Sequence, residues 1–520
     1  MPQIPRPRLS RRRSPHRASI FLPVVTIGLT LIALLRRILS ARRHVSESED
    51  DYRQARHRVL ILGGGFGGTT IARDLGKHFP NSHDVSILVV DRSTNLLYTP
   101  LLWTVADGRV NPNHVSVSLR GLQHGSPFHF LQADVQHIDL DRREVETSAG
   151  IRPYDTLVIG LGSVTSIPDL PGLRQHARRF ASPGDALELR NHLIDAVEAA
   201  HRARTQDERA EWLTFVVGGG GDTGVELATT IHEYLTNGLL AAYPWLADER
   251  PRVIVAGRND RLIPMSTPAT SEHVRSILSK QGIEIMTSTS ILSATESTVV
   301  TNHCTIGSRT LFWAAGISAV PVVQNLPIEH ARNGAIIVDD HLRVKDYPEV
   351  FAIGDSAWAF NADNGTGVPP TAQAAQSQGR YVADLILRRI EVDLSPTVPY
   401  SFKTRGRLAL LGRQTGVAEV GGHIVTGFPA WLLWHGYYIM SIPSWRNRVR
   451  LVGDLIISGV SGRETTQLQL NPRPLPDSST TNTNTTDGDG RGEHIANGHD
   501  ATTGDTSPES APAEPPVRIS

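Results

Sequence analysis

Apolar runs that end in glycine-rich turns occur at two places in the chain and set its predicted architecture. Residues 59–62 form a short apolar run typical of a buried parallel strand, and the stretch HRVLILGGGFGGTTIARDL continues through a glycine turn into a helical pattern. The stretch LTFVVGGGGDTGVELATTIHEYL repeats the order of strand, turn and helix. The chain is therefore predicted to be an α/β protein with two Rossmann-like domains.

The first glycine turn has the pattern of a dinucleotide-binding site. Its G-x-G-x-x-G spacing brings the backbone close to a pyrophosphate at the positive N-terminus of a helix. A second strand, VSILVVDRS, ends about 20 residues later at an aspartate, where a carboxylate would hold a ribose hydroxyl. A plain glycine-rich turn with a surface aspartate is disfavoured, because strand, turn, helix, strand and acid occur in order. The candidate cofactor-binding residues are Gly63, Gly65, Phe66, Gly67, Gly68 and Asp91.

The second glycine turn lacks the acid. Its G-x-G-x-x-G residues are Gly219, Gly221 and Gly224. The following strand, RVIVAG, ends at Gly257 and Arg258, whereas an acid there would bind the 2′-hydroxyl of NADH and repel the 2′-phosphate of NADPH. Arg258, and with it Arg261, could pair with that phosphate, or both could be solvated loop residues. The pattern indicates that NADPH is tolerated and does not exclude NADH.

Two such units are typical of flavoproteins that hold FAD in one domain and admit NAD(P)H to the other, so that the cofactor carries the reaction. Cys304 is the single cysteine, which excludes an intramolecular disulfide, a CxxC redox pair and a cysteine metal cluster. No metal site is predicted. The formal net charge is zero, so no global field favours nucleic acid as a partner.

Both ends of the chain differ from the globular middle. After a basic tail, residues 1–17, the segment 18–39 is predicted to be a transmembrane anchor, because residues 18–35 are uncharged and would span ~27 Å as a helix. A cleaved signal peptide is disfavoured, since no small-x-small site precedes the second arginine cluster. Arginines flank both sides and do not orient the segment. Residues 40–56 are a linker, and residues 471–520 are predicted to be disordered.

Several further motifs make the chain similar to a known family. The stretches LLYTPLLWTVADG, YDTLVIGLGS, LFWAAGIS and LRVKDYPEVFAIGDSA resemble those of the single-subunit type II NADH:quinone oxidoreductases, over roughly residues 58–470. The resemblance implies FAD-binding parts at residues 57–180 and 331–395, an NAD(P)H-binding domain at 181–330, and a membrane-associating region at 396–470. It also implies that cofactor-binding residues include Val135, Gly162, Gly316, Gly354, Asp355 and Ala374.

Outside the N-terminal segment, the C-terminal region gives the main indication that the protein associates with a membrane. Trp431, Trp434 and Trp445 lie close together beside tyrosines and arginines, which suits a helix that lies on anionic lipid. An ordinary buried helix is the alternative. Residues 431–440 are too short to cross a bilayer.

Elimination among related flavoproteins favours a quinone as the acceptor. Disulfide reductases and sulfide:quinone oxidoreductases need cysteines that this chain lacks, and ferredoxin reductases would not explain the aromatic and basic C-terminal region. We therefore expect hydride transfer from NAD(P)H to FAD and two-electron transfer to a quinone, without proton pumping, at a membrane and on its cytoplasmic side. A non-quinone acceptor, or a non-catalytic nucleotide-sensing flavoprotein, stays open. So does a homodimer.

The resemblance also names residues near the reacting groups. Glu226 matches a family glutamate near the flavin and would supply protons, although it could simply compensate the helix N-terminus. Gln373 in TAQAAQSQG matches the first of two family glutamines that line the quinone pocket. Ser377 replaces the second one, a helical turn later, and would leave that pocket wider or wetter. Arg405 falls where the family often has a basic residue near the flavin.

Overall fold

A six-stranded, mostly parallel sheet forms the first part of the fold. The computed structural model describes residues 49–468, apart from 81–83, 124–126 and 393–395. The sheet order is β21-β22-β9-β1-β2-β5, and only the edge pair β21–β22 is antiparallel. The strands are β1 (His57–Leu62), β2 (Val85–Asp91), β5 (His129–Gln132), β9 (Thr156–Ile159), β21 (Arg343–Val344) and β22 (Tyr347–Ala352).

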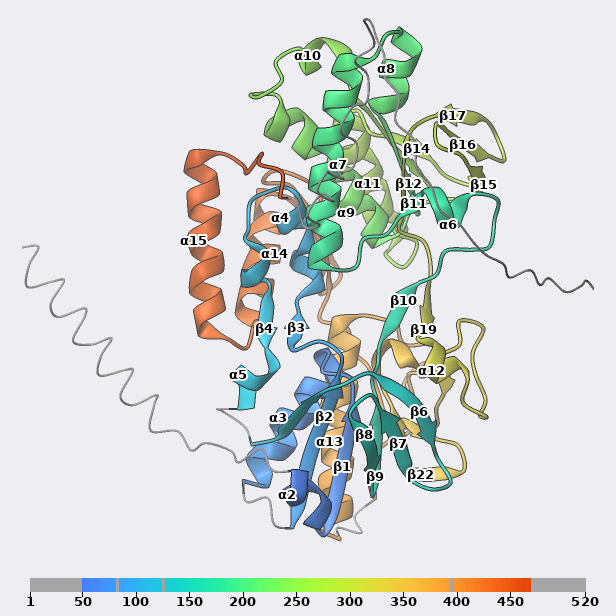
Figure 1. Ribbon diagram of the computed structural model, residues 1–520, viewed down its shortest axis with the longest axis vertical. Helices are drawn as coiled ribbons and strands as arrows, with labels where there is room; N and C mark the ends of the chain where they lie inside the picture. The colour runs from blue at the N-terminus through green and yellow to red at the C-terminus, as the bar shows by residue number, and fades with distance from the viewer. Residues whose placement is uncertain (1–48, 81–83, 124–126, 393–395, 469–520) are drawn as a thin grey trace, which may run out of the picture. The chain divides into compact units, whose positions relative to one another are not determined.

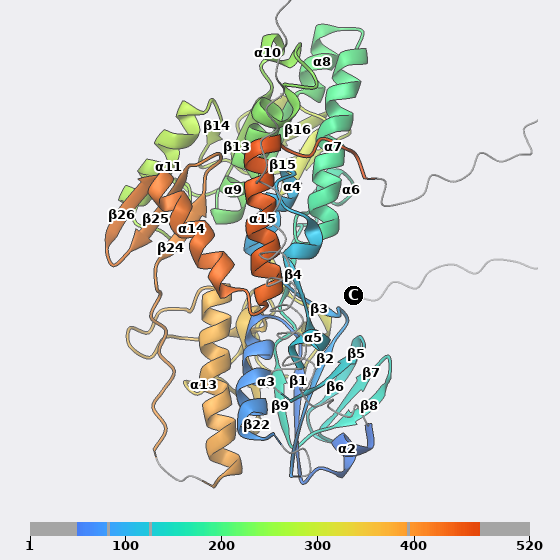
Figure 2. The ribbon, with the colours of Figure 1, turned by 90° about the vertical axis from the view of Figure 1, so that its left-hand side faces the viewer.

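Two helices pack side by side on one face of this sheet (Figures 1 and 2). They are α3 (Phe66–His78), which follows the first glycine turn, and α13 (Ala372–Ile390), which begins with the stretch AQAAQSQG. Their backbones approach closely, since a Cβ added at Gly379 would lie 2.7 Å from the carbonyl oxygen of Gly67. This contact brings the start of the late helix beside the early glycine turn, as expected if residues 57–180 and 331–395 form one domain.

A second, five-stranded sheet is fully parallel, with the order β11-β18-β12-β13-β14. Its strands are β11 (Ala177–Arg178), β12 (Thr214–Gly218), β13 (Arg252–Ala256), β14 (Glu284–Met286) and β18 (Thr310–Trp313). Helices α7 (Pro183–Arg202), α9 (Asp222–Glu233) and α11 (Pro268–Lys280) accompany it. Because β11 already belongs to this sheet, the second domain begins slightly before the predicted boundary at residue 181.

Short antiparallel strands connect and extend the two sheets. The chain passes from one domain to the other and back through β10 (Ser163–Thr165) and β19 (Ile317–Ala319), which pair with each other. The smaller sheets contain β3 (Asn95–Leu97), β4 (Ser116–Ser118), β6 (Val135–Asp139), β7 (Glu144–Thr147), β8 (Gly150–Pro153), β15 (Ile291–Ala294), β16 (Thr298–Thr301), β17 (Thr305–Gly307), β20 (Ile336–Ile337) and β23 (Ala357–Trp358).

Short helices complete the two domains. The α-helices are α2 (Glu49–Gln54), α4 (Leu102–Ala106), α5 (Leu119–Gln123), α6 (Leu173–His176), α8 (Gln206–Trp212), α10 (Leu246–Glu249) and α12 (Pro321–Gln324). The 3-10 turns are η1 (Thr99–Leu101), η2 (Pro112–His114) and η4 (Gly354–Ser356), and η3 (Tyr234–Leu239) is a π-helical turn that continues α9.

The C-terminal region consists of a three-stranded antiparallel sheet and two helices. The sheet contains β24 (Arg407–Leu410), β25 (Gly416–Val420) and β26 (His423–Gly427), followed by α14 (Phe428–Ser441) and α15 (Trp445–Ser461). The region contacts both domains: the Tyr98 hydroxyl donates to the carbonyl of Ser441 (2.6 Å), and Arg463 pairs with Glu233 (2.7 Å).

Across the described residues, no helix has the length and apolar character needed to cross a membrane. The predicted anchor, residues 18–39, and the predicted disordered tail, residues 471–520, lie outside the described part of the chain.

Candidate active site

The first glycine turn is shaped for close approach of a ligand. Gly63 has a φ of +101°, and a Cβ there would lie 2.2 Å from the carbonyl oxygen of Gly160, so only glycine fits. Gly65, at the N-cap of α3, has nothing near its Cβ position and faces open space. Asp91, at the end of β2, accepts a hydrogen bond from the backbone N–H of Gly64 (2.6 Å). Burial raises the pKa of Asp91 despite that bond.

A cavity of about 1080 Å³ follows this turn. Eight of the predicted cofactor-binding residues line it: Gly65, Phe66, Gly67, Asp91, Val135, Gly162, Gly354 and Asp355. Gly63 and Gly68 do not line it, and a Cβ at Gly68 would lie 2.0 Å from the carbonyl oxygen of Gly63. Ala374 is buried and does not line the cavity, whereas its neighbour Ala375 does. The cradle of small residues, with an acid at one end, fits an extended dinucleotide such as FAD.

The loop at Gly354 and Asp355 is held by a residue that the sequence did not single out. The backbone N–H of Gly354 donates to Oε1 of Gln378 (2.6 Å), a buried side chain on α13. Ser163, at the domain crossover, donates to Asp355 Oδ2 (2.6 Å). Burial raises the pKa of Asp355, and the bond from Ser163 opposes that rise. The glutamine-rich stretch at the start of α13 therefore fixes the loop that faces this cavity.

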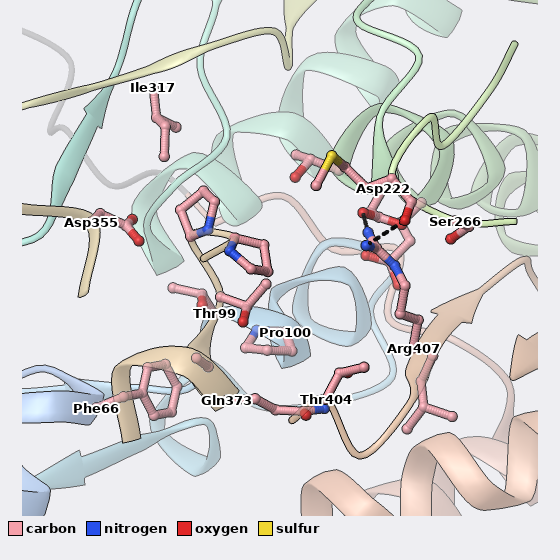
Figure 3. A pocket seen from close by; sticks show the side chains of 18 of the residues that line it. Phe66, Thr99, Pro100, Asp222, Ser266, Ile317, Asp355, Gln373, Thr404 and Arg407 are labelled. Atoms are coloured by element: carbon pink, nitrogen blue, oxygen red, sulfur yellow. Dashed lines mark hydrogen bonds and ion pairs between the residues drawn. The ribbon is translucent and has the colours of Figure 1, made fainter. Parts of the chain in front are cut away.

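A second cavity, of about 1180 Å³, adjoins the first. Phe66, Thr99 and Asp355 lie on the walls of both, as do residues 370–372 at the start of α13. Beyond this junction the second cavity passes between α9 and the C-terminal region (Figure 3). The residues at this junction would therefore touch both a group bound in the first cavity and a group bound in the second. Gly316, predicted at the return crossover, lines this second cavity.

Glu226 lies deep in the wall of the second cavity, with part of its surface open to it. Its Oε1 accepts a hydrogen bond from the backbone N–H of Leu410 (3.0 Å), so the C-terminal sheet closes over it. Burial raises the pKa of Glu226 to about 8, and the nearby Asp222 adds to the rise. The indoles of Trp103 and Trp434 lower the pKa slightly, but neither N–H forms a well-directed hydrogen bond. Glu226 therefore holds its proton more tightly than an ordinary carboxyl group.

The glutamine-rich stretch turns a different set of side chains toward this cavity from the set that was predicted. Gln373 lines it, and its amide contacts the backbone of Arg405 and Gly406 (3.3 Å each). Ser377 lines neither cavity, and its side chain faces Tyr400, where it lowers the tyrosine pKa against the dominant effect of burial. Gln376 lines the cavity instead, because residues three apart also share a helix face. The prediction that Ser377 lines the pocket is therefore wrong.

The basic residue at the cavity is Arg407 and not Arg405, since the exposed side chain of Arg405 is not on the wall. Arg407 pairs with Asp222 on the first turn of α9 (2.6 Å) and donates to the carbonyl of Met265 (3.0 Å). Figure 3 shows this pair at one side of the cavity. Arg405 precedes β24, which begins at Arg407, so the basic side chain on the wall lies two positions later than the resemblance placed it.

The second glycine turn repeats the construction of the first. Gly219 has a φ of +138°, and a Cβ at Gly224 would lie 1.8 Å from the carbonyl oxygen of Gly219. Gly221 is the N-cap of α9 and faces open space. None of these three glycines lines either cavity, so a dinucleotide on this turn would lie outside both. Asp222, the next residue after Gly221, does line the second cavity, and a dinucleotide would enter it there. Arg258 is exposed just after β13.

Some of the C-terminal aromatic side chains are buried in the protein and others are exposed on its surface. Trp434 is 1% exposed, and Tyr437 and Tyr438 line the second cavity, so the buried-helix alternative holds for this side of α14. Trp445 on α15 is 59% exposed. The sequence could not divide them, because aromatic residues suit both a core and a lipid interface.

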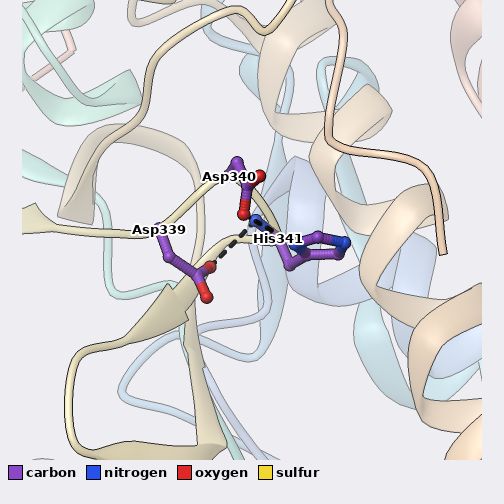
Figure 4. A group of neighbouring side chains, drawn as sticks. All are labelled: Asp339, Asp340 and His341. Carbon is purple, nitrogen blue, oxygen red and sulfur yellow. Dashed lines mark hydrogen bonds and ion pairs between the residues drawn. The ribbon is translucent and has the colours of Figure 1, made fainter.

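Asp339, Asp340 and His341 lie within reach of one another (Figure 4). The Nδ1 of His341 contacts Asp340 (2.7 Å) and its Nε2 contacts Thr397 (2.8 Å), while Asp339 accepts from the backbone N–H of Arg343 (2.7 Å). These contacts close the turn before β21, and we assign no metal to the group.

Comparison with known proteins agrees with this geometry. A family model described as pyridine nucleotide-disulphide oxidoreductase matches residues 57–379, and one described as NDH2 C-terminal domain matches residues 405–464. The chain is 29% identical over 422 residues to the type II NADH:quinone oxidoreductase NdhA of Mycobacterium tuberculosis, covering 78% of this chain and 87% of that protein. It is 28% identical over 405 residues to the demethylphylloquinone reductase NdbB of Synechocystis sp., covering 76% and 94%.

A solved structure of NDH2 from Plasmodium falciparum in complex with NADH has a similar fold. It matches with a TM-score of 0.72 at 19% identity and covers 79% of this chain and 100% of that chain.

Proposed function

Because the chain belongs to the pyridine nucleotide-disulphide oxidoreductase family, as the match over residues 57–379 shows, we propose that it is a membrane-associated NAD(P)H:quinone oxidoreductase with bound FAD. The observation that carries this proposal is the pair of adjoining cavities, which meet at Phe66 and Asp355. The matches to relatives named for quinone reduction cover 78% and 76% of this chain, and the NDH2 C-terminal domain model matches residues 405–464.

The residues around the cavities suit the two half-reactions. FAD, when bound, would accept hydride from NAD(P)H and pass two electrons to the quinone. Gly63 to Gly68 and Asp91 would hold its pyrophosphate and ribose, and the loop of Gly354 and Asp355 would hold its other end. The amides of Gln373 and Gln376 would donate hydrogen bonds to a quinone oxygen in the second cavity.

Glu226 would supply a proton. A carboxyl with a pKa of about 8 carries a proton at neutral pH and gives it up to a more basic oxygen. Its place in the wall of the second cavity puts that proton on the acceptor side. The N–H of Leu410 would stabilise the carboxylate that remains, and solvent would return the proton.

The C-terminal helices would keep the enzyme at the lipid surface, where a quinone dissolves. Trp445, Val449, Val452, Ile456 and Val460 are exposed on α15 at spacings of one helical face. Leu432, Leu433 and Met440 add exposed apolar side chains on α14. The segment 18–39 would add a single-pass anchor, with the catalytic part on the cytoplasmic side where nicotinamide nucleotides are supplied.

Steady-state kinetics with a soluble quinone analogue test the proposal. The purified protein should carry FAD and oxidise NADH or NADPH only when the quinone is present. Gln376→Ala should raise the KM for quinone and leave the KM for the nucleotide unchanged. Nucleotide oxidation that does not depend on quinone would favour another acceptor, and absence of flavin would contradict the proposal.

A further inference from the structure

The carboxyl end of β13 lies where a dinucleotide fold selects its nucleotide. β13 runs parallel between β12 and β14, in register from Val217 opposite Val255 to Ala256 opposite Met286. In such folds an acid at this strand end holds the 2′-hydroxyl of NADH. Here β13 ends at Ala256 and is followed by Gly257 and Arg258.

Gly257 borders the glycine turn directly. A Cβ added there would lie 3.0 Å from the backbone N of Gly220 and 3.1 Å from its Cα. A side chain at this position would therefore crowd the backbone of the turn. No carboxylate at this position repels a phosphate, and the chain can approach the nucleotide closely.

Arg258 is exposed on a loop whose backbone is fixed. The N–H of Ser288 donates to the carbonyl of Asn259 (2.8 Å), and that of Thr289 donates to the carbonyl of Gly257 (2.8 Å). Within the described residues, the Arg258 guanidinium has no hydrogen bond or ion pair. Arg261 differs, because its Nη2 donates to the carbonyl of Pro264 (2.8 Å).

From these contacts we propose that Arg258 binds the 2′-phosphate of NADPH, so that the protein selects NADPH over NADH. A guanidinium presents a planar pair of N–H donors that fits phosphate oxygens, and here it stands on a fixed loop without a competing partner. Asp260, the nearest acid in sequence, forms no ion pair with Arg258 within the described residues. The inference rests on the proposed function, since it names the nucleotide that the same site takes.

Anaerobic flavin reduction by each nucleotide tests the inference in the holoenzyme. The wild type should be bleached faster by NADPH than by NADH at equal, subsaturating concentrations. Arg258→Gln should lower the NADPH rate roughly tenfold or more and leave the NADH rate within about twofold, because one charged hydrogen-bond partner of the phosphate is lost. Lys280→Gln, which removes an exposed charge from the same domain, should change neither rate.

Calorimetry supplies a readout that needs no electron transfer. The holoenzyme should bind adenosine 2′,5′-bisphosphate more tightly than 5′-AMP, and Arg258→Gln should bind the two alike. A wild type that prefers NADH, or a variant that loses affinity for both ligands equally, would overturn the inference. Neither assay contains quinone, so failure to reduce a quinone would contradict the proposed function and leave these results standing.

Discussion

At the scale of single residues, Glu226 should make the catalytic activity depend on pH. Its pKa is raised to about 8 by burial, so the protonated form that would serve the quinone is lost above that pH. We predict that kcat falls as pH rises through about 8 and that Glu226→Gln abolishes this limb and lowers kcat by roughly 10²-fold. A pH profile of kcat measures both. An alkaline limb that survives in the variant would assign the titration to another group.

The same shift predicts a stability effect. The folded pKa of Glu226 lies above its ordinary value of 4.5, so the folded state binds the proton more tightly than the unfolded state. Stability from this group is therefore present below about 4.5 and is lost as pH rises to about 8. Glu226→Gln should raise the Tm more at pH 9 than at pH 6, as thermal denaturation at the two values would show. An equal change at both would contradict the raised pKa.

Gln376 and Ser377 test the phase of the helix at the acceptor cavity. Gln376 lines the cavity and Ser377 faces Tyr400. We predict that Gln376→Ala raises the KM for a quinone analogue several-fold, as expected for the loss of about 1 kcal/mol from one hydrogen bond. Ser377→Ala is the matched control and should leave that KM within twofold. If Ser377→Ala raised the KM and Gln376→Ala did not, Ser377 would line the cavity, as expected from the sequence.

At the scale of elements, the exposed face of α15 should decide lipid binding. Val449, Val452 and Ile456 lie on that face and pack against little else, so their replacement by serine should leave the Tm nearly unchanged. Co-sedimentation with anionic vesicles should fall several-fold. Val382→Ser, in the buried part of α13, is the contrasting variant and should lower the Tm. Unchanged vesicle binding with altered sedimentation size would indicate a face that meets a second copy.

The strands and turns could be predicted from the sequence, but the side of each helix that faces a cavity could not. The two glycine turns, β1, β2 and Asp91 follow from local patterns, because apolar runs and G-x-G-x-x-G spacing depend on nearby residues alone. The burial of Trp434 and the place of Gln376 depend on which side of α14 or α13 meets a cavity, which tertiary packing decides. Gln378 was missed because its bond to Gly354 joins segments 24 residues apart.

At the scale of the whole molecule, the C-terminal region is tied to the NAD(P)H domain by a buried ion pair. Arg463 and Glu233 are 8% and 7% exposed and lie 2.7 Å apart. Arg463→Gln should destabilise the protein by about 3–5 kcal/mol, because it leaves the Glu233 charge buried without its partner. Chemical denaturation measures the loss. Arg252→Gln, which breaks an exposed pair with Glu284, is the control and should cost less than about 1 kcal/mol.

In the proposed enzyme, one flavin site joins a nucleotide on the second glycine turn to a quinone in the second cavity. Anaerobic stopped-flow spectroscopy of the holoenzyme tests it most directly, by adding NADPH or NADH first and a quinone second. We expect the nucleotide to bleach the flavin and the flavin absorbance to recover fully when quinone is added. A flavin that bleaches and then stays reduced in the presence of quinone would contradict it.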